Sequence, residues 1–301
     1  MRVLDLSFSS VEGKLKNEGL IFKIGFSVVC LKSALPNVAK DLATFYAFYE
    51  LAGDDAFIDF YITLDSSLLR RWFKPQVNFS FDGFHPFKPL PQNQSFAMFE
   101  WGFNWVVAQN AHQYLILHSA VVEKNGKAFI FPGTPGSGKS TLCAAMVSRG
   151  WRLLSDEMAL LNIETGLLQP IPRPISLKNE SINIIGRFAP DFVIGEAVYD
   201  TAKGTVAHVR APEDSVTLSA KLVFPSAIVF PKYKKGARTE LVQITKGVAF
   251  MKVAENSFNY SVLGEIAFDI LADTVERCDC FEFRYQDLPE AIDLFDSMVA
   301  E

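Results

Sequence analysis

The stretch "FPGTPGSGKSTL", residues 131–142, decides the fold of this chain. It has the spacing Gly, four residues, Gly-Lys-Ser, with Gly133 and Gly138 as the two glycines. In such a pattern successive backbone N–H groups approach phosphate oxygens, because glycine leaves room for them. We therefore predict a nucleotide phosphate-binding loop formed by Gly133, Thr134, Pro135, Gly136, Ser137, Gly138, Lys139, Ser140 and Thr141.

Two side chains of this loop have distinct expected roles. The Lys139 ammonium neutralises charge between the two outer phosphates of ATP, and the Ser140 hydroxyl ligates Mg²⁺. A helix is predicted from Lys139 onward, ending at Arg149-Gly150, and its N-terminus adds partial positive charge. The alternative is a glycine-rich turn that only caps a helix, which would leave a buried lysine without a partner.

An acidic pair follows the loop in the sequence, at an interval that is informative about the fold. Asp156 and Glu157 lie 17 and 18 positions after Lys139, an interval that fits one short helix and one returning strand. The acids are then expected at the same sheet edge as the loop. Asp156 is the candidate proton acceptor, and Ser140, Asp156 and Glu157 are the candidate metal ligands. The alternative is a solvated pair at the start of a turn.

The histidine upstream of the loop is placed by a hairpin. Asn125-Gly126 between two β-type runs predicts a two-residue turn, so that Lys124 faces Lys127. Continued along both strands, this register sets His118 beside Gly133. His118 is therefore a candidate catalytic residue that orients a phosphate oxygen or supports the acids; the alternative is a structural histidine. The other histidines, His85, His112 and His208, are expected to be structural.

The N-terminal part is expected to form a small α+β module. Residues 20–31 and 56–64 have strand character, and residues 36–50 between them have helix character. Residues 82–93 contain three prolines and a glycine, which is typical of a boundary or a surface crossing. An amphipathic helix is predicted within residues 95–114, with a core-facing stripe of Phe96, Phe99, Phe103 and Val106.

The rest of the chain has α/β character. Strands are predicted at 221–231 and 278–285, helices at 262–276 and 287–299, and a second hairpin around Thr165-Gly166. With 301 residues the chain exceeds the usual size of one domain. We predict an N-terminal module at 1–92, a connecting helix at 93–117 and a loop-bearing domain at 118–301.

Composition limits the function classes. A net charge of −5 and a pI of about 5.5 argue against general nucleic-acid binding. The sequence has no signal-like start and no run of about 18 apolar residues, so a cytoplasmic protein without membrane insertion is expected. Four cysteines are expected to be reduced, since Cys278 and Cys280 have no further zinc ligands nearby.

These motifs resemble a known family. The segments "HSAVVEKNGKAFIFPGTPGSGKSTL" and "GWRLLSDE" resemble the catalytic domain of HPr kinase/phosphorylase, and "EWGFNWVVAQNAHQYLILHSAVVE", "PRPISLKNESI", "VAHVRAP" and "AIVFPKY" are similar to the HPr-kinase-related kinase A family. The resemblance covers most of residues 95–301. It implies a P-loop kinase domain akin to phosphoenolpyruvate carboxykinase that phosphorylates a hydroxyl, typically of a protein serine. His118 matches the family histidine, Asp156 the first acid of its Asp-Asp pair, and Glu157 replaces the second.

The chain also departs from that family. The glycine-rich signature tied to phosphorolysis is absent, and "RPISLKNES", residues 173–181, stands in the comparable region, so neither phosphorolysis nor HPr itself is expected. Arg173 and Lys178 are candidates for binding phosphate or substrate, or are solvated loop charges. The cluster Lys232–Arg238 is expected to be an exposed turn, with docking of an acidic partner as the alternative.

The leading expectation is therefore an ATP-dependent, Mg²⁺-requiring kinase with Asp156, His118 and Lys139 as catalytic residues and a serine or threonine of a protein or peptide as acceptor. A small-molecule kinase and a non-catalytic nucleotide-sensing module are the alternatives. The sequence does not identify the acceptor, and it leaves a homo-oligomer open. No LSGGQ-like segment is present, which argues against an ABC-type motor.

Overall fold

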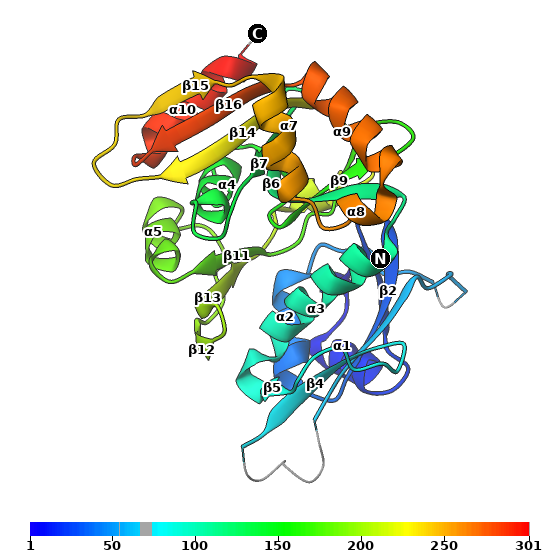
Figure 1. Ribbon diagram of the computed structural model, residues 1–301. Coiled ribbons are helices and arrows are strands. Elements are labelled where there is room, and N and C mark those ends of the chain that lie inside the picture. The colour runs from blue at the N-terminus through cyan, green and yellow to red at the C-terminus, as the bar shows by residue number, and fades with distance from the viewer. Residues whose placement is uncertain (54, 67–73, 301) are drawn as a thin grey trace.

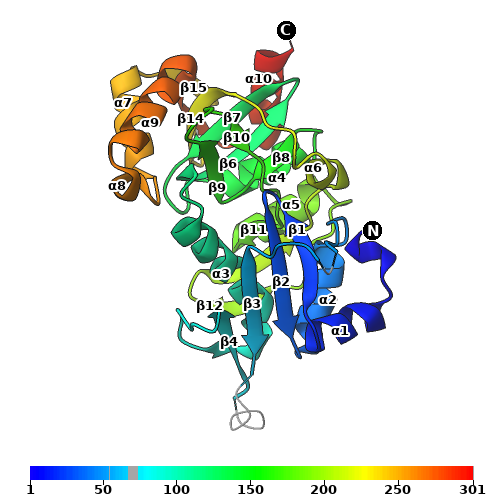
Figure 2. The ribbon, with the colours of Figure 1, turned by 90° about the vertical axis from the view of Figure 1, so that its right-hand side faces the viewer.

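Two sheets on either side of a central helix organise the chain. The computed structural model describes residues 1–53, 55–66 and 74–300. A five-stranded sheet, with its helices, forms an N-terminal unit, and an eight-stranded sheet carries the glycine-rich loop (Figures 1 and 2). Both sheets mix parallel and antiparallel strands. The α/β class is thereby confirmed.

The N-terminal sheet has its strands in sequence order. The predicted strand at 20–31 is wrong, because the chain reverses at Gly25, whose φ is 58°, and splits it into two. The predicted helix at 36–50 ends early, at Phe45, and the strand expected at 56–64 begins only at Phe60. The elements are η1 Val3–Asp5, α1 Phe8–Lys16, β1 Leu20–Ile24, β2 Ser27–Ser33, α2 Pro36–Phe45, β3 Phe60–Asp65, β4 Gln76–Phe81 and β5 Leu90–Pro91.

The helix α3, Ser95–Asn110, follows a short turn η3, Gln92–Gln94, and lies between the two units. The stripe Phe96, Phe99, Phe103 and Val106 is buried as predicted, but Met98, Glu100 and Val107 are buried as well. The prediction of an amphipathic helix was therefore wrong. The N-terminal sheet covers one side of α3, and residues that follow the acidic pair in sequence cover another.

The hairpin that positions the loop has the predicted register. β6, Tyr114–Lys124, and β7, Lys127–Pro132, pair antiparallel with Lys124 opposite Lys127 and Ser119 opposite Pro132. Asn125 and Gly126 both have positive φ, 55° and 80°, as a type I′ turn requires. The alternation along β7 then sends Phe129 and Phe131 to one face of the sheet and Ala128 and Ile130 to the other.

Three parallel strands end beside the loop. β7, β14 (Pro225–Tyr233) and β16 (Asp279–Tyr285) are parallel neighbours, so their carboxyl ends share one edge. Both faces of these strands are buried, which explains their long apolar runs. α4 (Lys139–Val147) and α10 (Leu288–Val299) cover one face, while α7 (Lys246–Glu255) and α9 (Glu265–Arg277) cover the other (Figure 1).

The remaining predictions of local structure hold with small changes. The helix expected at 262–276 is interrupted at Gly264, whose φ is 59°. Cys278 and Cys280 are both buried in the cluster beneath α7 and α9. The Asp287 carboxylate accepts the backbone N–H of Glu290 at 3.0 Å, which caps α10. The other elements are β10 Leu168–Gln169, α5 Glu180–Phe188, α6 Glu213–Thr217, β15 Glu240–Gln243 and α8 Tyr260–Leu263.

An interrupted strand carries the acidic pair. β8, Arg152–Ser155, and β9, Met158–Asn162, both pair antiparallel with β6, and Asp156 and Glu157 lie between them. Since β8 is antiparallel to β6, it runs parallel to β7 and ends at the same edge as β7. The acids therefore follow β8 at the edge where the loop follows β7.

A three-stranded sheet joins this edge to the N-terminal unit. Its order is β11 (Ile175–Lys178), β13 (Gly204–Val209) and β12 (Val198–Thr201). The turn between β12 and β13 reaches towards α3 and η3 (Figures 1 and 2). Among the described residues, no helix has both the length and the apolar character needed to cross a membrane.

Candidate functional site

The glycine-rich loop connects the end of β7 to the start of α4. Gly136 and Gly138 have φ of 85° and 98°, a region that glycine adopts without strain. A Cβ atom at Gly138 would lie 2.4 Å from the Tyr285 hydroxyl, which itself donates a hydrogen bond to the Gly138 carbonyl at 3.0 Å. Tyr285, at the end of β16, thus fixes the loop and requires glycine at position 138.

Lys139 is buried within the loop that precedes it. Only 7% of its surface is exposed, and its ammonium donates hydrogen bonds to the carbonyls of Gly133 and Thr134. Burial lowers the pKa of Lys139, although Asp156 and Glu157 oppose that change with their charge. The loop therefore encloses a cation that faces the acidic pair.

Asp156 is a buried carboxyl group with one oxygen unpaired. Its Oδ2 accepts the backbone N–H of Ser176 at 3.1 Å, while Oδ1 is buried without a hydrogen-bond partner among the described residues. Burial, followed by the charge of Glu157, raises the pKa of Asp156 to about 7; the Ser176 N–H, Lys178 and the Ser140 hydroxyl oppose the increase. Asp156 can therefore take up and release a proton near neutral pH.

Glu157 has the opposite electrostatic surroundings. Its Oε2 lies 3.6 Å from Nε2 of His118, and its Oε1 lies 3.8 Å from Nζ of Lys178. Burial alone would raise the pKa of Glu157, but the nearby His118 ring and the charges of Lys178 and Lys203 outweigh it and lower the pKa. Near neutral pH the negative charge of the pair therefore lies on Glu157, while Asp156, with a pKa of about 7, is partly protonated.

His118 contacts the acids rather than the loop. Its backbone N–H donates to the carbonyl of Asn256 at 2.6 Å, and its ring lies 5.6 Å from that of Phe258, centroid to centroid. These contacts orient the imidazole towards Glu157. Of the two roles considered for His118, support of the acidic pair is the one that this geometry favours.

The predicted metal ligands are oxygen donors at one place. Asp156 offers an unpaired Oδ1, and the Ser140 hydroxyl lies close enough to lower the pKa of that carboxyl group. Oxygen donors suit Mg²⁺, which usually takes one or two carboxylates together with water and phosphate oxygens. In the described part of the chain, no group of three or more His, Cys, Asp and Glu side chains is placed to hold a metal ion. These residues thus fit Mg²⁺ held jointly with a phosphate.

Arg173 does not face the site. The side chain is buried, its guanidinium lies 3.0 Å from Glu100 Oε2, bonds Asn104, and stacks over the Phe103 ring at 4.9 Å. The predictions of a phosphate-binding or solvated arginine were both wrong. A residue 73 positions away supplies the carboxylate that holds it, which local sequence does not reveal.

A cavity of about 520 Å³ opens beside the loop, and neither Asp156 nor Glu157 lines it. The loop residues Pro132–Ser137 form one wall, and the ends of β14 and β16 and the helix α7 form the others. Lys252 and Glu282 pair across it. Two residues of the predicted exposed turn at 232–238, Lys232 and Tyr233, line this cavity. The only indication of this in the sequence is that the strands predicted at 221–231 and 278–285 both end beside the cavity.

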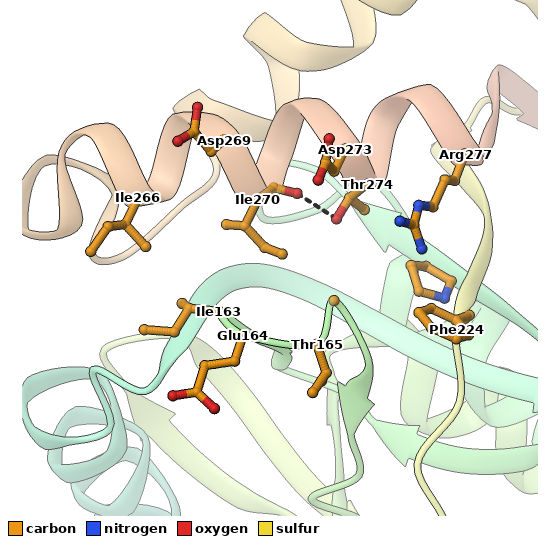
Figure 3. Close-up of a pocket in the computed structure, with 12 residues that line it drawn as sticks. Ile163, Glu164, Thr165, Phe224, Ile266, Asp269, Ile270, Asp273, Thr274 and Arg277 are labelled. Atoms are coloured by element: carbon orange, nitrogen blue, oxygen red, sulfur yellow. Dashed lines mark hydrogen bonds between the residues drawn. The ribbon is translucent and has the colours of Figure 1, made fainter.

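A second cavity, of about 260 Å³, lies at the other end of β9, away from the acids. Figure 3 shows Ile266 and Ile270 of α9 pointing towards the segment around Thr165, with Arg277 above Phe224. None of the predicted site residues lines it. Five residues of β9 separate it from the acidic pair, so it is not part of the loop site.

Sequence reasoning missed one residue near Glu157, Lys203. Lys203, in the turn between β12 and β13, places its ammonium 5.0 Å from the centre of the Trp101 ring and lowers the pKa of Glu157. A signal existed in the "AKG" turn between two short β-type runs, but nothing local shows which way it points. His208, expected to be structural, is buried against Phe96, and burial lowers its pKa to about 3.

Comparison with known proteins adds no identity. The comparison with protein-family models gave no match, and neither did the comparison with curated proteins. What is known of this chain's chemistry therefore rests on its residues and their geometry.

Proposed function

We propose that this protein is an ATP-dependent phosphotransferase that moves the γ-phosphate to a hydroxyl group, of a serine or threonine in a protein or peptide. The observation that carries the proposal is the position of the acidic pair at the same sheet edge as a lysine enclosed by a glycine-rich loop. The strand order supports a P-loop kinase domain of the HPr kinase and phosphoenolpyruvate carboxykinase type, since loop and acids follow parallel strands at one edge.

In this proposal the loop binds the phosphate chain. Loop N–H groups and the N-terminus of α4 point at phosphate oxygens, and Lys139 exchanges the carbonyls of Gly133 and Thr134 for them. The nucleoside half occupies the 520 Å³ cavity beside the loop, and the terminal phosphate then lies near Asp156 and Glu157.

The two acids have separate tasks. Asp156 accepts the proton of the acceptor hydroxyl through its unpaired Oδ1, and its pKa of about 7 suits a base that works near neutral pH. Glu157 stays charged because His118 and Lys178 hold it. Mg²⁺, when bound by Ser140 and an acid, would neutralise phosphate charge and align the reacting oxygens. Positioning and charge stabilisation supply most of the rate gain.

The test uses ATP labelled on the γ-phosphate, Mg²⁺ and a cell lysate. We expect label to move into a macromolecule, Asp156→Asn to reduce turnover about 10³-fold or more with nucleotide affinity nearly unchanged, and Lys139→Met to weaken nucleotide binding. Asp293→Asn, on the exposed side of α10, is the matched control and should retain activity.

Other outcomes would identify the alternatives. Label found only in a dialysable product would indicate a small-molecule kinase. ATP binding without transfer to either fraction, with Asp156→Asn behaving as the parent protein in every assay, would reject phosphotransfer and leave a nucleotide-sensing module.

A further inference from the structure

An excess of positive charge surrounds the acidic pair. Three ammonium groups, those of Lys139, Lys178 and Lys203, act electrostatically on two carboxyl groups, those of Asp156 and Glu157, so the positive groups outnumber the negative ones. The neighbouring Arg173 does not change this balance, because Glu100 pairs with it. A local surplus of positive charge attracts anions, so this arrangement suits a site that receives one.

Two of the three lysines are not part of the loop. Lys178 ends β11, with Nζ 3.8 Å from Glu157 Oε1. Lys203 lies on the turn between β12 and β13 and over the Trp101 ring. Lys178 also lowers the pKa of Lys203, after the effect of burial, so these like charges are held near each other.

The turn that carries Lys203 is built to hold its position. The Thr201 hydroxyl donates to the Gly204 carbonyl at 2.6 Å and accepts the Lys203 N–H at 3.0 Å. Gln94 of the N-terminal unit donates to the Asp200 carbonyl at 3.3 Å. The indole N–H of Trp101 is buried without a hydrogen-bond partner among the described residues, so a donor without an acceptor lies under the same turn.

We propose that Lys178 and Lys203, above Trp101, form an anion-binding subsite for the phosphate acceptor at the junction of the two units. The acceptor then carries a carboxylate or phosphate close to the hydroxyl that receives the phosphoryl group. This inference rests on the proposed function and specifies its substrate class. It also gives the N-terminal unit a part in the site, because α3 supplies Trp101.

The test uses inorganic phosphate as the probe. Protein is first saturated with Mg²⁺ and the non-hydrolysable β,γ-imido analogue of ATP, and phosphate binding is then measured by calorimetry. We expect one phosphate to bind, and Lys178→Met and Lys203→Met each to weaken it about tenfold or more, the effect of losing a hydrogen bond to a charged group. Lys16→Met, at an exposed position of α1, is the matched control and should change affinity less than about twofold.

Two results would overturn the inference. Equal phosphate affinity in all variants would mean that the lysines only neutralise Glu157. Loss of phosphate binding once the analogue is present, with weaker analogue binding in the lysine variants, would mean that they hold the nucleotide's terminal phosphate. Failure of this inference can be told from failure of the proposed function by the affinity for the ATP analogue. The proposed function fails if Lys139→Met leaves the affinity for the analogue unchanged.

The source of the anion is read from transfer assays. Serine peptides with flanking Asp are compared with flanking Asn, and glycerate is compared with glycerol. We expect the anionic member of one pair to be preferred, and Lys203→Met to remove that preference. No preference in either pair would also overturn the inference.

Discussion

Two buried carboxyl groups, those of Glu100 and Asp156, have different surroundings. Glu100 receives hydrogen bonds from the Tyr46 hydroxyl at 2.6 Å and from Arg173 at 3.0 Å. Asp156 receives the Ser176 N–H, the Ser140 hydroxyl lies close by, and Oδ1 has no partner within hydrogen-bond distance in the described part of the chain. Each is about 95% buried, so burial alone does not distinguish them.

The difference distinguishes a closed cluster, in which the protein itself supplies the partners of a buried carboxylate, from an open site, in which one carboxylate oxygen has none. The Glu100 cluster pairs a charge with a charge and joins α2, α3 and the segment before β11. At Asp156 the same depth of burial raises the pKa to about 7 without a paired charge to oppose it closely, and an oxygen remains available. The first arrangement stabilises the junction, while the second is the kind found at reactive sites.

Breaking the closed cluster should have the largest effect on stability. Arg173→Met leaves the Glu100 charge buried and unpaired, so we expect the free energy of unfolding to fall by about 3 to 5 kcal/mol. Chemical denaturation measures this. The double variant Arg173→Met, Glu100→Leu should recover most of the loss, since an apolar pair needs no solvation. If Arg173→Met alone were as stable as the parent protein, Glu100 would not depend on Arg173 for its charge partner.

The open site should reveal itself through pH. The pKa of Asp156 is raised from 3.8 to about 7 in the folded state, so folding favours its protonated form and stability from this group declines as pH rises from about 4 to 7. Asp156→Asn removes that decline. We expect the free energy of unfolding of the variant, relative to that of the parent, to increase by about 2 to 4 kcal/mol from pH 4 to pH 8, measured by urea unfolding at each pH. A constant difference would contradict the raised pKa.

A matched pair of hydroxyl deletions should give the smallest effect and the sharpest comparison. Tyr46→Phe removes a hydrogen bond to a charged carboxylate, and we expect a cost of about 1.5 to 3 kcal/mol. Ser176→Ala removes a buried hydroxyl oxygen without a partner in the described residues, and should cost less than about 0.5 kcal/mol. Thermal unfolding of the two variants at one pH measures these costs. Equal costs would remove the distinction between the surroundings of Glu100 and those of Asp156.

Sequence reasoning reached the parts of the site that local rules determine. The register of the hairpin at Asn125-Gly126 follows from turn geometry, and the interval from Lys139 to Asp156 follows from one helix and one strand. The contact between His118 and Glu157 is consistent with both. Each of these depends on neighbours close in the chain.

The parts that it missed depend on distant partners. Arg173 and Glu100 are 73 positions apart, and Lys203 meets Trp101 from a turn 102 positions later. Hydrophobic periodicity gave the stripe of α3 but not its second buried side, because the element covering that side comes much later in the sequence. In the N-terminal sheet, one apolar run held two strands, and only Gly25 marked the reversal.

The burial of α3 on two sides has a consequence for handling the protein. The larger apolar core runs without a break from Val11 and Phe22, through Phe99, to Phe131 and Phe295, so the two units share one interior. A cut in the chain after Asn110 would expose an apolar surface of each half to water. Neither half should be expressed or studied as an independent fragment.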